Sequence, residues 1–214
     1  MKTLLSKGIL SLGVLVTLAL TGGSAKADTF TFTGINTSVS GTVNITKLSN
    51  NMLSVTITNT STGAVTGKLT SIGFDLPGSG TGSFTLASAS NPNYRLETQI
   101  AGNAAGINRT FEVSLLTGAN FNGGGNPNRG IVEGASATFS ISGDFTGFSQ
   151  QQIALGMFLR FQDVNAGGGS DVARCTNCAG QKEVPEPATM VLLGTGLAGI
   201  AGTIRKRRNA AKLE

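Results

Sequence analysis

The chain has 214 residues, of which only 13% are charged and 31 are glycine. Soluble domains carry about 25% charged residues and about 7% glycine, so Ser, Thr and Asn supply much of the polar content here. The low charge excludes a typical disordered chain, which combines high net charge with low hydrophobicity. Gly, Thr, Ser and Val in place of strong helix formers favour short strands joined by turns.

The net charge of +5 comes from the two ends of the chain. Between Asp28 and Val184 there are eight Lys or Arg residues against nine Asp or Glu residues. A nucleic-acid-binding domain needs a basic face on its folded part, and this balance supplies none. We therefore expect no nucleic-acid partner and interpret the terminal charges as routing signals.

The first 27 residues have the pattern of a secretory signal peptide. Lys2 and Lys7 precede an apolar core at residues 9–20, and small residues follow at the end of the segment. The core is too short for a stable membrane span. We predict that signal peptidase cuts between Ala27 and Asp28, with a retained N-terminal anchor as the alternative.

The C-terminal end contains an uncharged apolar segment at residues 188–204. As a helix it would be roughly 26 Å long, just under the ~30 Å hydrocarbon core of a bilayer. A basic cluster follows at once, and such a cluster stays on the cytoplasmic side. Its members are Arg205, Lys206, Arg207 and Arg208. We predict a single transmembrane helix in the inner membrane, with the bulk of the chain outside.

A proline-framed tripeptide, Pro185-Glu186-Pro187, stands directly before this segment. The two prolines keep it extended and remove backbone donors, which leaves a segment that a protease-like active site can grip. Tripeptide, apolar helix and basic cluster, over roughly residues 184–208, together resemble the PEP-CTERM sorting signal. The resemblance implies that an exosortase, a membrane cysteine transpeptidase-like enzyme of Gram-negative bacteria, recognises Pro185, Glu186 and Pro187. It also implies an association with exopolysaccharide and biofilm or floc. The alternative is a simple tail anchor with a rigid entry turn.

Residues 28–174 are long enough for one domain with a real core. Alternation of apolar and polar residues recurs along them, most clearly at residues 29–33, 53–58, 111–115 and 137–142. Residues 157–162 are more apolar, as in a central strand, and 148–156 is the best candidate for a short helix. About nine short strands separated by turn signals predict an all-β fold, an antiparallel β-sandwich or jelly roll.

Cys175 and Cys178 follow the predicted domain in a segment that we interpret as a linker. Outside the cytoplasm the two thiols can oxidise, which favours a local disulfide. A redox motif would need a thioredoxin-like helix after a strand, and a metal site would need two further ligands. We divide the chain into a signal peptide (1–27), an ectodomain (28–174), a linker (175–184), the sorting signal (185–208) and a tail (209–214).

The chain has no histidine, which removes Ser-His-Asp and Cys-His nucleophiles and most zinc enzymes. We expect a protein that is not an enzyme and has no cofactor. A hydrolase with a pair of carboxylates is the alternative that needs no histidine. Its candidate residues are Asp75, Glu97, Glu112, Glu133, Asp144, Asp163 and Asp171.

A calcium site is a further alternative, although we expect no metal. Asp163, Asn165 and Asp171 flank a Gly-rich loop, and carboxylates with loop carbonyls suit Ca²⁺. The spacing does not match an EF-hand.

The sequence as a whole predicts a non-enzymatic exported surface or extracellular-matrix protein. An exosortase would process it at the tail, so that it is anchored transiently at the inner membrane and then lies at the cell surface or outside. A carbohydrate-binding module, using the polar loops 91–95 and 120–129, is the alternative. Sugar stacking usually needs Trp or Tyr, and the chain has no Trp and a single Tyr, Tyr94.

Overall fold

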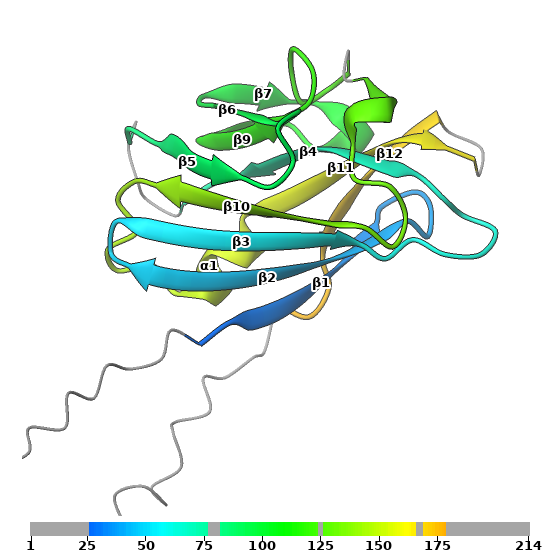
Figure 1. The fold of residues 1–214 in the computed structure, drawn as a ribbon. Coiled ribbons are helices and arrows are strands. Elements are labelled where there is room, and N and C mark those ends of the chain that lie inside the picture. The colour runs from blue at the N-terminus through cyan, green and yellow to red at the C-terminus, as the bar shows by residue number, and fades with distance from the viewer. Residues whose placement is uncertain (1–25, 77–81, 124–125, 166–168, 179–214) are drawn as a thin grey trace, which may run out of the picture.

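The computed structural model describes residues 26–76, 82–123, 126–165 and 169–178, which form a domain made almost wholly of strands (Figure 1). The strands are β1 (Asp28–Gly34), β2 (Ser40–Ser49), β3 (Met52–Asn59), β4 (Lys68–Phe74), β5 (Thr85–Ala89), β6 (Arg95–Glu97), β7 (Ile100–Gly102), β8 (Arg109–Phe111), β9 (Val113–Leu116), β10 (Ser136–Ser142), β11 (Met157–Val164) and β12 (Gly169–Cys175). The helical elements are the 3-10 turns η1 (Ala104–Gly106) and η2 (Pro127–Arg129) and the helix α1 (Gln150–Leu155).

Ten of these strands form one antiparallel sheet in the order β5-β10-β3-β2-β1-β12-β11-β4-β9-β6. The sheet curls so far that its edge strands β5 and β6 come into contact (Figure 1). The prediction of an antiparallel all-β fold is therefore confirmed. The main sheet is continuous rather than divided in two, because β12 pairs with β1 on one side and with β11 on the other. Strands β7 and β8 form a separate hairpin.

The core lies between the two halves of the curled sheet. Phe30 of β1, Phe139 of β10 and Phe161 of β11 are fully buried in it. Gly41 of β2 lies so close to the opposite half that an added Cβ would come within 2.9 Å of Leu159 Cδ1 on β11. Phenylalanine suits this core because it fills space without needing a polar partner.

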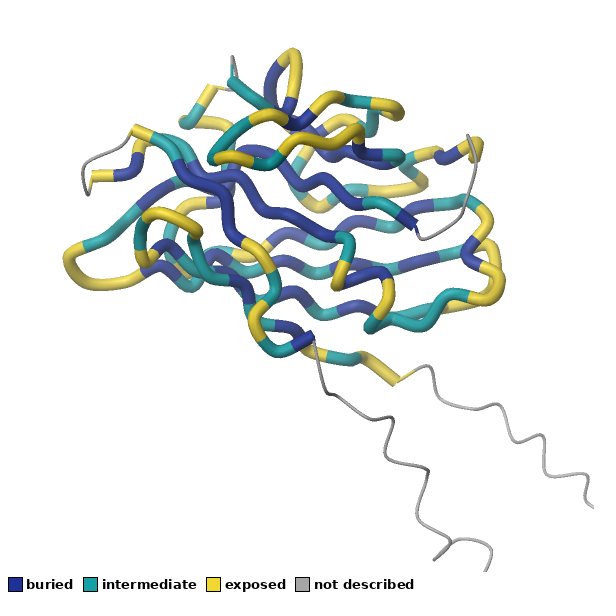
Figure 2. The backbone as a smooth tube through the Cα atoms, turned by 180° about the vertical axis from the view of Figure 1, so that it is seen from behind, coloured by how far each residue is buried: buried dark blue, intermediate teal, exposed yellow. Residues whose placement is uncertain are grey.

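The two halves differ on their outer faces. In β2, β3 and β10 buried and partly exposed residues alternate, as expected for strands with one face toward solvent (Figure 2). In β4, β9 and β11 most residues are buried on both faces. A second apolar cluster explains this, since Ile100 of β7 and Ala104 and Ala105 of η1 pack over the outer face of that half. Its buried members are Phe111, Leu116, Phe121, Phe158 and Val172.

The domain extends beyond the boundary predicted at residue 174. Strand β12 ends at Cys175, and Cys178 is fully buried in the main core. The cysteine segment assigned to the linker thus begins as part of the fold. Helix α1 lies inside the predicted stretch 148–156, and a capping box between Ser149 and Gln152 defines its start.

The closure of the sheet can be tested at Phe139, whose ring packs edge-on against Tyr94 with centroids 5.1 Å apart. We expect Phe139→Ala to lower the free energy of unfolding by about 3–5 kcal/mol, because it leaves a cavity in the core. Urea denaturation followed by far-UV circular dichroism measures this loss. Phe139→Leu, the control, retains most of the apolar volume and should lose less. A loss for the alanine variant of only about 0.5 kcal/mol, typical of a surface position, would contradict this core.

Candidate functional site

The two ends of the described chain meet at helix α1. The side chain of Gln150 donates from Nε2 to the carbonyl oxygen of Lys26 at 2.6 Å and to that of Ile45 at 2.9 Å. The neighbouring Gln151 donates from Nε2 to the carbonyl oxygen of Cys178. The chain therefore enters and leaves the domain at the same end (Figures 1 and 2).

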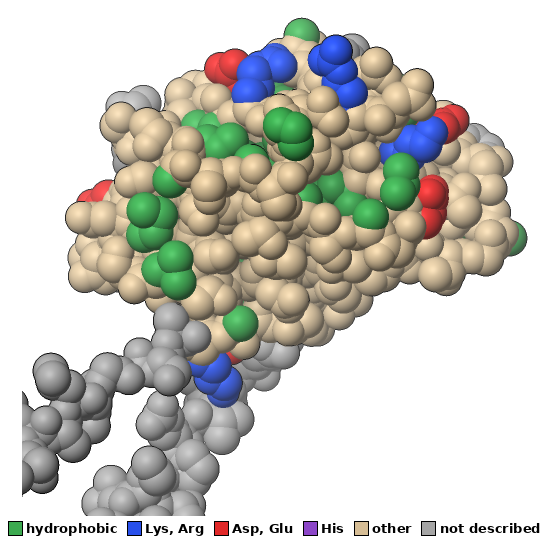
Figure 3. Space-filling view, in the orientation of Figure 1, with side chains coloured by type: hydrophobic (Ala, Val, Ile, Leu, Met, Phe, Trp, Pro, Cys, Tyr) green, Lys and Arg blue, Asp and Glu red, His purple; other side chains and the backbone are tan. Residues whose placement is uncertain are grey.

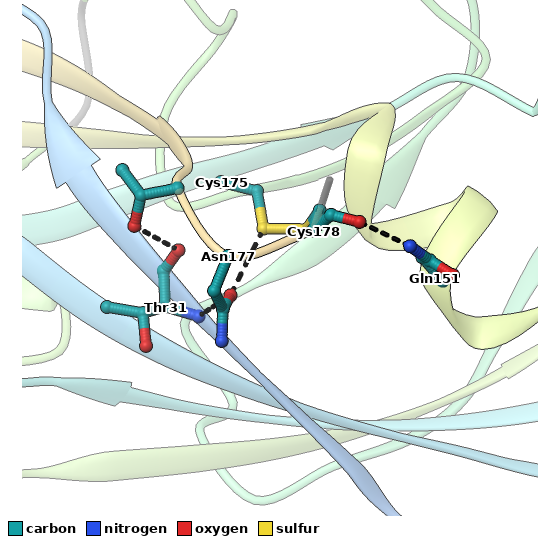
Figure 4. Close-up of a disulfide and its surroundings, with 6 residues drawn as sticks. Thr31, Gln151, Cys175, Asn177 and Cys178 are labelled. Carbon is teal, nitrogen blue, oxygen red and sulfur yellow. Dashed lines mark hydrogen bonds between the residues drawn. A yellow bond between two sulfur atoms is a disulfide. The ribbon is translucent and has the colours of Figure 1, made fainter. Parts of the chain in front are cut away.

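A disulfide joins Cys175 and Cys178 at this end, with a Cα–Cα distance of 5.7 Å (Figure 4). Hydrogen bonds fasten the same turn to β1. The Thr31 N–H donates to Asn177 Oδ1 at 2.8 Å, and the Thr176 N–H donates to the Thr31 carbonyl at 2.9 Å. The disulfide favoured by the sequence is present, and it closes the last turn of the folded domain.

The predicted sorting residues begin shortly after this turn. Six residues separate Cys178 from Pro185, and a fully extended chain of that length reaches no more than about 25 Å. Pro185, Glu186, Pro187, the apolar segment 188–204 and the basic cluster 205–208 lie outside the described residues. Within the described ranges, no helix has the length and apolar character needed to cross a membrane.

The predicted signal-peptide cleavage site lies at the start of the fold. Residues 1–25 are outside the described ranges, Ala27 is exposed, and Asp28 begins β1. Cleavage between Ala27 and Asp28 would leave the mature chain starting with its first strand.

The three calcium candidates make separate contacts with the protein. Asp171 of β12 is fully buried, and its Oδ2 accepts hydrogen bonds from Thr37 N–H and Thr37 Oγ1, each at 2.7 Å. Asp163 pairs with Lys68 at 2.9 Å. Asn165 Oδ1 accepts a hydrogen bond from the backbone N–H of Thr66 at 2.9 Å. Among the described residues, no group of three or more His, Cys, Asp or Glu side chains is placed to hold a metal ion.

Two of the seven acidic candidates, Asp75 and Glu112, are brought together. The Glu112 N–H donates to Asp75 Oδ1 at 3.3 Å, and Arg109 pairs with Asp75 Oδ2 at 3.2 Å. Burial raises the pKa of Asp75, while the Glu112 N–H and Arg109 oppose that rise. Glu112 Oε2 accepts from the N–H of Leu76 at 2.9 Å, so both carboxylates hold the strands around them.

The polar loops proposed for sugar binding do lie beside each other. Asn91 Nδ2 donates to the carbonyl oxygen of Arg129 at 3.4 Å. Tyr94 is buried in the core, however, and its hydroxyl donates to the Leu69 carbonyl. Its ring is therefore not exposed for stacking on a sugar.

A buried cation on β11 was not identified from the sequence. Arg160 is only 6% exposed, its Nη2 donates to Ser170 Oγ at 3.1 Å, and its Nε has no partner among the described residues. Burial lowers the pKa of Arg160, and the charge of Asp171 opposes that effect. A lone arginine inside the apolar stretch 157–162 was the available signal.

Comparison with known families concerns the C-terminal segment. Residues 183–208 match the family model of the PEP-CTERM protein-sorting motif. The chain is thus of the class routed by a C-terminal sorting signal. It carries a PEP-CTERM protein-sorting motif at its C-terminal end, which confirms the resemblance, and the motif implies export, processing during membrane transit and an exosortase as the processing partner. Neither a curated protein nor a solved structure matches the chain.

The disulfide should contribute modestly to stability because it closes a short loop. We expect Cys175→Ala/Cys178→Ala to lower the free energy of unfolding by about 2 kcal/mol, as measured by urea denaturation. Dithiothreitol should lower the wild-type midpoint to a similar degree and leave the double variant unchanged, which is the matched control. Equal stability of the oxidised wild type and the variant would contradict a closed turn.

The Asp171 carboxylate should act as a structural acceptor. We expect Asp171→Asn to destabilise the protein by about 1–3 kcal/mol, because one buried acceptor oxygen is replaced by a donor facing the N–H groups of Asn36 and Thr37. Asp163→Asn, which alters an exposed ion pair, is the control and should cost less than about 1 kcal/mol. If excess CaCl₂ instead raises the wild-type unfolding midpoint and Asp171→Asn abolishes that rise, this carboxylate belongs to a cation site.

Proposed function

We propose that this protein is a non-enzymatic component of the cell surface or extracellular matrix. Signal peptidase removes residues 1–27, helix 188–204 anchors the exported chain transiently in the inner membrane, and an exosortase processes it near Pro185-Glu186-Pro187. The mature domain then associates with exopolysaccharide or biofilm. The PEP-CTERM motif at residues 183–208 is the observation that carries this proposal.

The arrangement of the folded domain supports the proposal. Both ends of the domain lie at α1, so one short connection separates the whole domain from the sorting signal. A disulfide between Cys175 and Cys178 suits an oxidising compartment outside the cytoplasm.

The contacts of the acidic residues also support a non-enzymatic role over the hydrolase alternative. Asp75 and Glu112 are the carboxylates brought together, and protein donors occupy them at 2.9–3.3 Å. A glycosidase would need two carboxyl groups facing a sugar across a cleft.

Sorting can be tested by replacing Pro185, Glu186 and Pro187 with alanine in the native host. We expect the wild type to appear in the outer fractions with a mass shortened at both ends. The variant should lose only its signal peptide and stay in the inner-membrane fraction, because the extended recognition segment is gone. Cell fractionation with intact-mass measurement reports both properties.

The matched control is Gly180→Ala/Gln181→Ala, which changes the neighbouring residues and keeps the tripeptide. It should distribute and be processed as the wild type is. Identical masses and identical distributions for the wild type and the tripeptide variant would remove the sorting proposal.

A further inference from the structure

The outer face of β1, β2, β3 and β10 is not covered by any described residue and consists mostly of hydroxyl side chains. We call it the hydroxyl face, and it comprises the outward polar residues of β1, β2, β3 and β10, none of which is buried. These residues are Thr29, Thr31, Thr33, Ser40, Thr42, Asn44, Thr46, Ser54, Thr56, Thr58, Ser136, Thr138, Ser140 and Ser142. Two apolar residues of these strands, Leu48 and Met52, are also not buried and lie at one end, beside the turn between β2 and β3.

Strand register arranges these side chains in rows across the sheet. One row runs Thr31, Thr42, Thr58, Ser136, and the next runs Thr29, Asn44, Thr56, Thr138. Neighbouring strands lie about 4.8 Å apart, and successive outward residues of one strand lie about 7 Å apart. The face is therefore a regular two-dimensional array of donors and acceptors.

Several of these hydroxyls bond to one another across strands. Thr56 Oγ1 and Thr138 Oγ1 lie 2.8 Å apart, and Thr58 Oγ1 and Ser136 Oγ lie 2.7 Å apart. A hydroxyl has one donor and two acceptor positions, so each pair still has positions left for an outside partner. The hydrogen bonds between the hydroxyls order these side chains but leave part of their hydrogen-bonding capacity free.

The hydroxyl face carries no charged side chain. In Figure 3 it lies in front, and the Lys, Arg, Asp and Glu side chains are confined to its margins. At the border, Arg174 of β12 stands opposite Thr33 of β1. Surfaces of small domains usually contain about 25–35% charged residues, which makes a charge-free area of four strands unusual.

This chemistry selects among partners. A polyanion would find no cations here, and an apolar protein surface would leave the hydroxyls without partners. The face's unburied apolar residues, Leu48 and Met52, lie at one end, so the face has no central apolar core of the kind typical of a protein–protein interface. A chain of uncharged sugars presents hydroxyls at every residue, and these can exchange hydrogen bonds with the rows without bringing charges out of water.

We propose that the hydroxyl face binds an uncharged polysaccharide chain laid over β1, β2, β3 and β10. This deepens the proposed function, on which it rests for the extracellular setting, by naming the surface and the class of ligand. Affinity comes from many weak contacts along the polymer, so binding strengthens with polymer length.

The test is affinity electrophoresis of the full chain, purified in a mild detergent, in gels that contain dextran, mannan or alginate. We expect the wild type to be retarded by at least one of the two uncharged polymers and not by alginate. The variant Thr42→Val/Thr56→Val/Thr58→Val should bind that polymer at least tenfold more weakly, because it loses three hydroxyls and keeps the side-chain shape. Circular dichroism and the urea midpoint verify that each variant is folded.

Two controls separate hydroxyl chemistry from packing. Thr110→Val, at an exposed position of strand β8 in the separate hairpin, should bind as the wild type does. Thr42→Ser/Thr56→Ser/Thr58→Ser retains the hydroxyls and should retain most of the binding.

The proposal is overturned if neither uncharged polymer retards the wild type, if alginate retards it more strongly, or if the valine variant binds equally well. It is also overturned if the face mediates only self-association, which sedimentation of the wild type and the valine variant reveals. The sorting proposal fails separately: the valine variant should be sorted normally, and the tripeptide variant should bind polysaccharide normally.

Discussion

Strand β12 is the constraint on which the rest of the structure depends. It pairs with β1, where Phe32 lies opposite Cys175, and with β11, where Leu159 lies opposite Ala173. Joining the first strand to a late one turns ten strands into a single curled sheet and encloses the core. The same strand carries Asp171, whose buried carboxylate holds the turn at Asn36 and Thr37. Without β12 the two halves would share no hydrogen bonds along this seam.

The unequal covering of the two halves follows from this closure. The hairpin β7–β8 and η1 lie over the outer face of one half, and Phe158 of β11 and Val172 of β12 are buried in the cluster between them and the sheet. No described residue forms such a layer over the other half, and most of its outward residues are polar, as a solvated face requires. The preference of β-branched side chains for a pleated surface explains the threonines, and the serines are small polar residues suited to a solvated face. Strand preference does not explain why the hydroxyl face has no charged side chains, because Lys and Glu are also tolerated on solvated faces. We therefore look for a functional reason for this lack of charge.

Features that depend on the local order of residues can be predicted from this sequence. The pairing of strands that lie far apart in the chain cannot. Alternation at 29–33, 53–58 and 137–142 correctly predicted β1, β3 and β10. The stretch 111–115 divides between β8 and β9, because the Glu112 N–H turns toward Asp75. Strand β12 is not among the predicted strands, because a Gly-rich stretch precedes it and residues 171–173 are all buried, so they show no alternation. The sorting motif can be recognised from the order of its residues alone. The hydroxyl rows depend on the register between neighbouring strands, which a single sequence does not reveal.

The two proposals complement each other physically. Before processing, a connection of no more than about 25 Å ties the α1 end of the domain to the sorting signal. The proposed cut near Pro185 would remove that tie together with the predicted membrane helix, so a released domain would need another means of staying near the cell. Its few charges offer little electrostatic attraction to a charged matrix, because the counts of Lys and Arg and of Asp and Glu between Asp28 and Val184 nearly balance. A repeated, uncharged array of hydroxyls provides many weak contacts to a polymer, and such multivalent contact retains a protein even when each contact is weak.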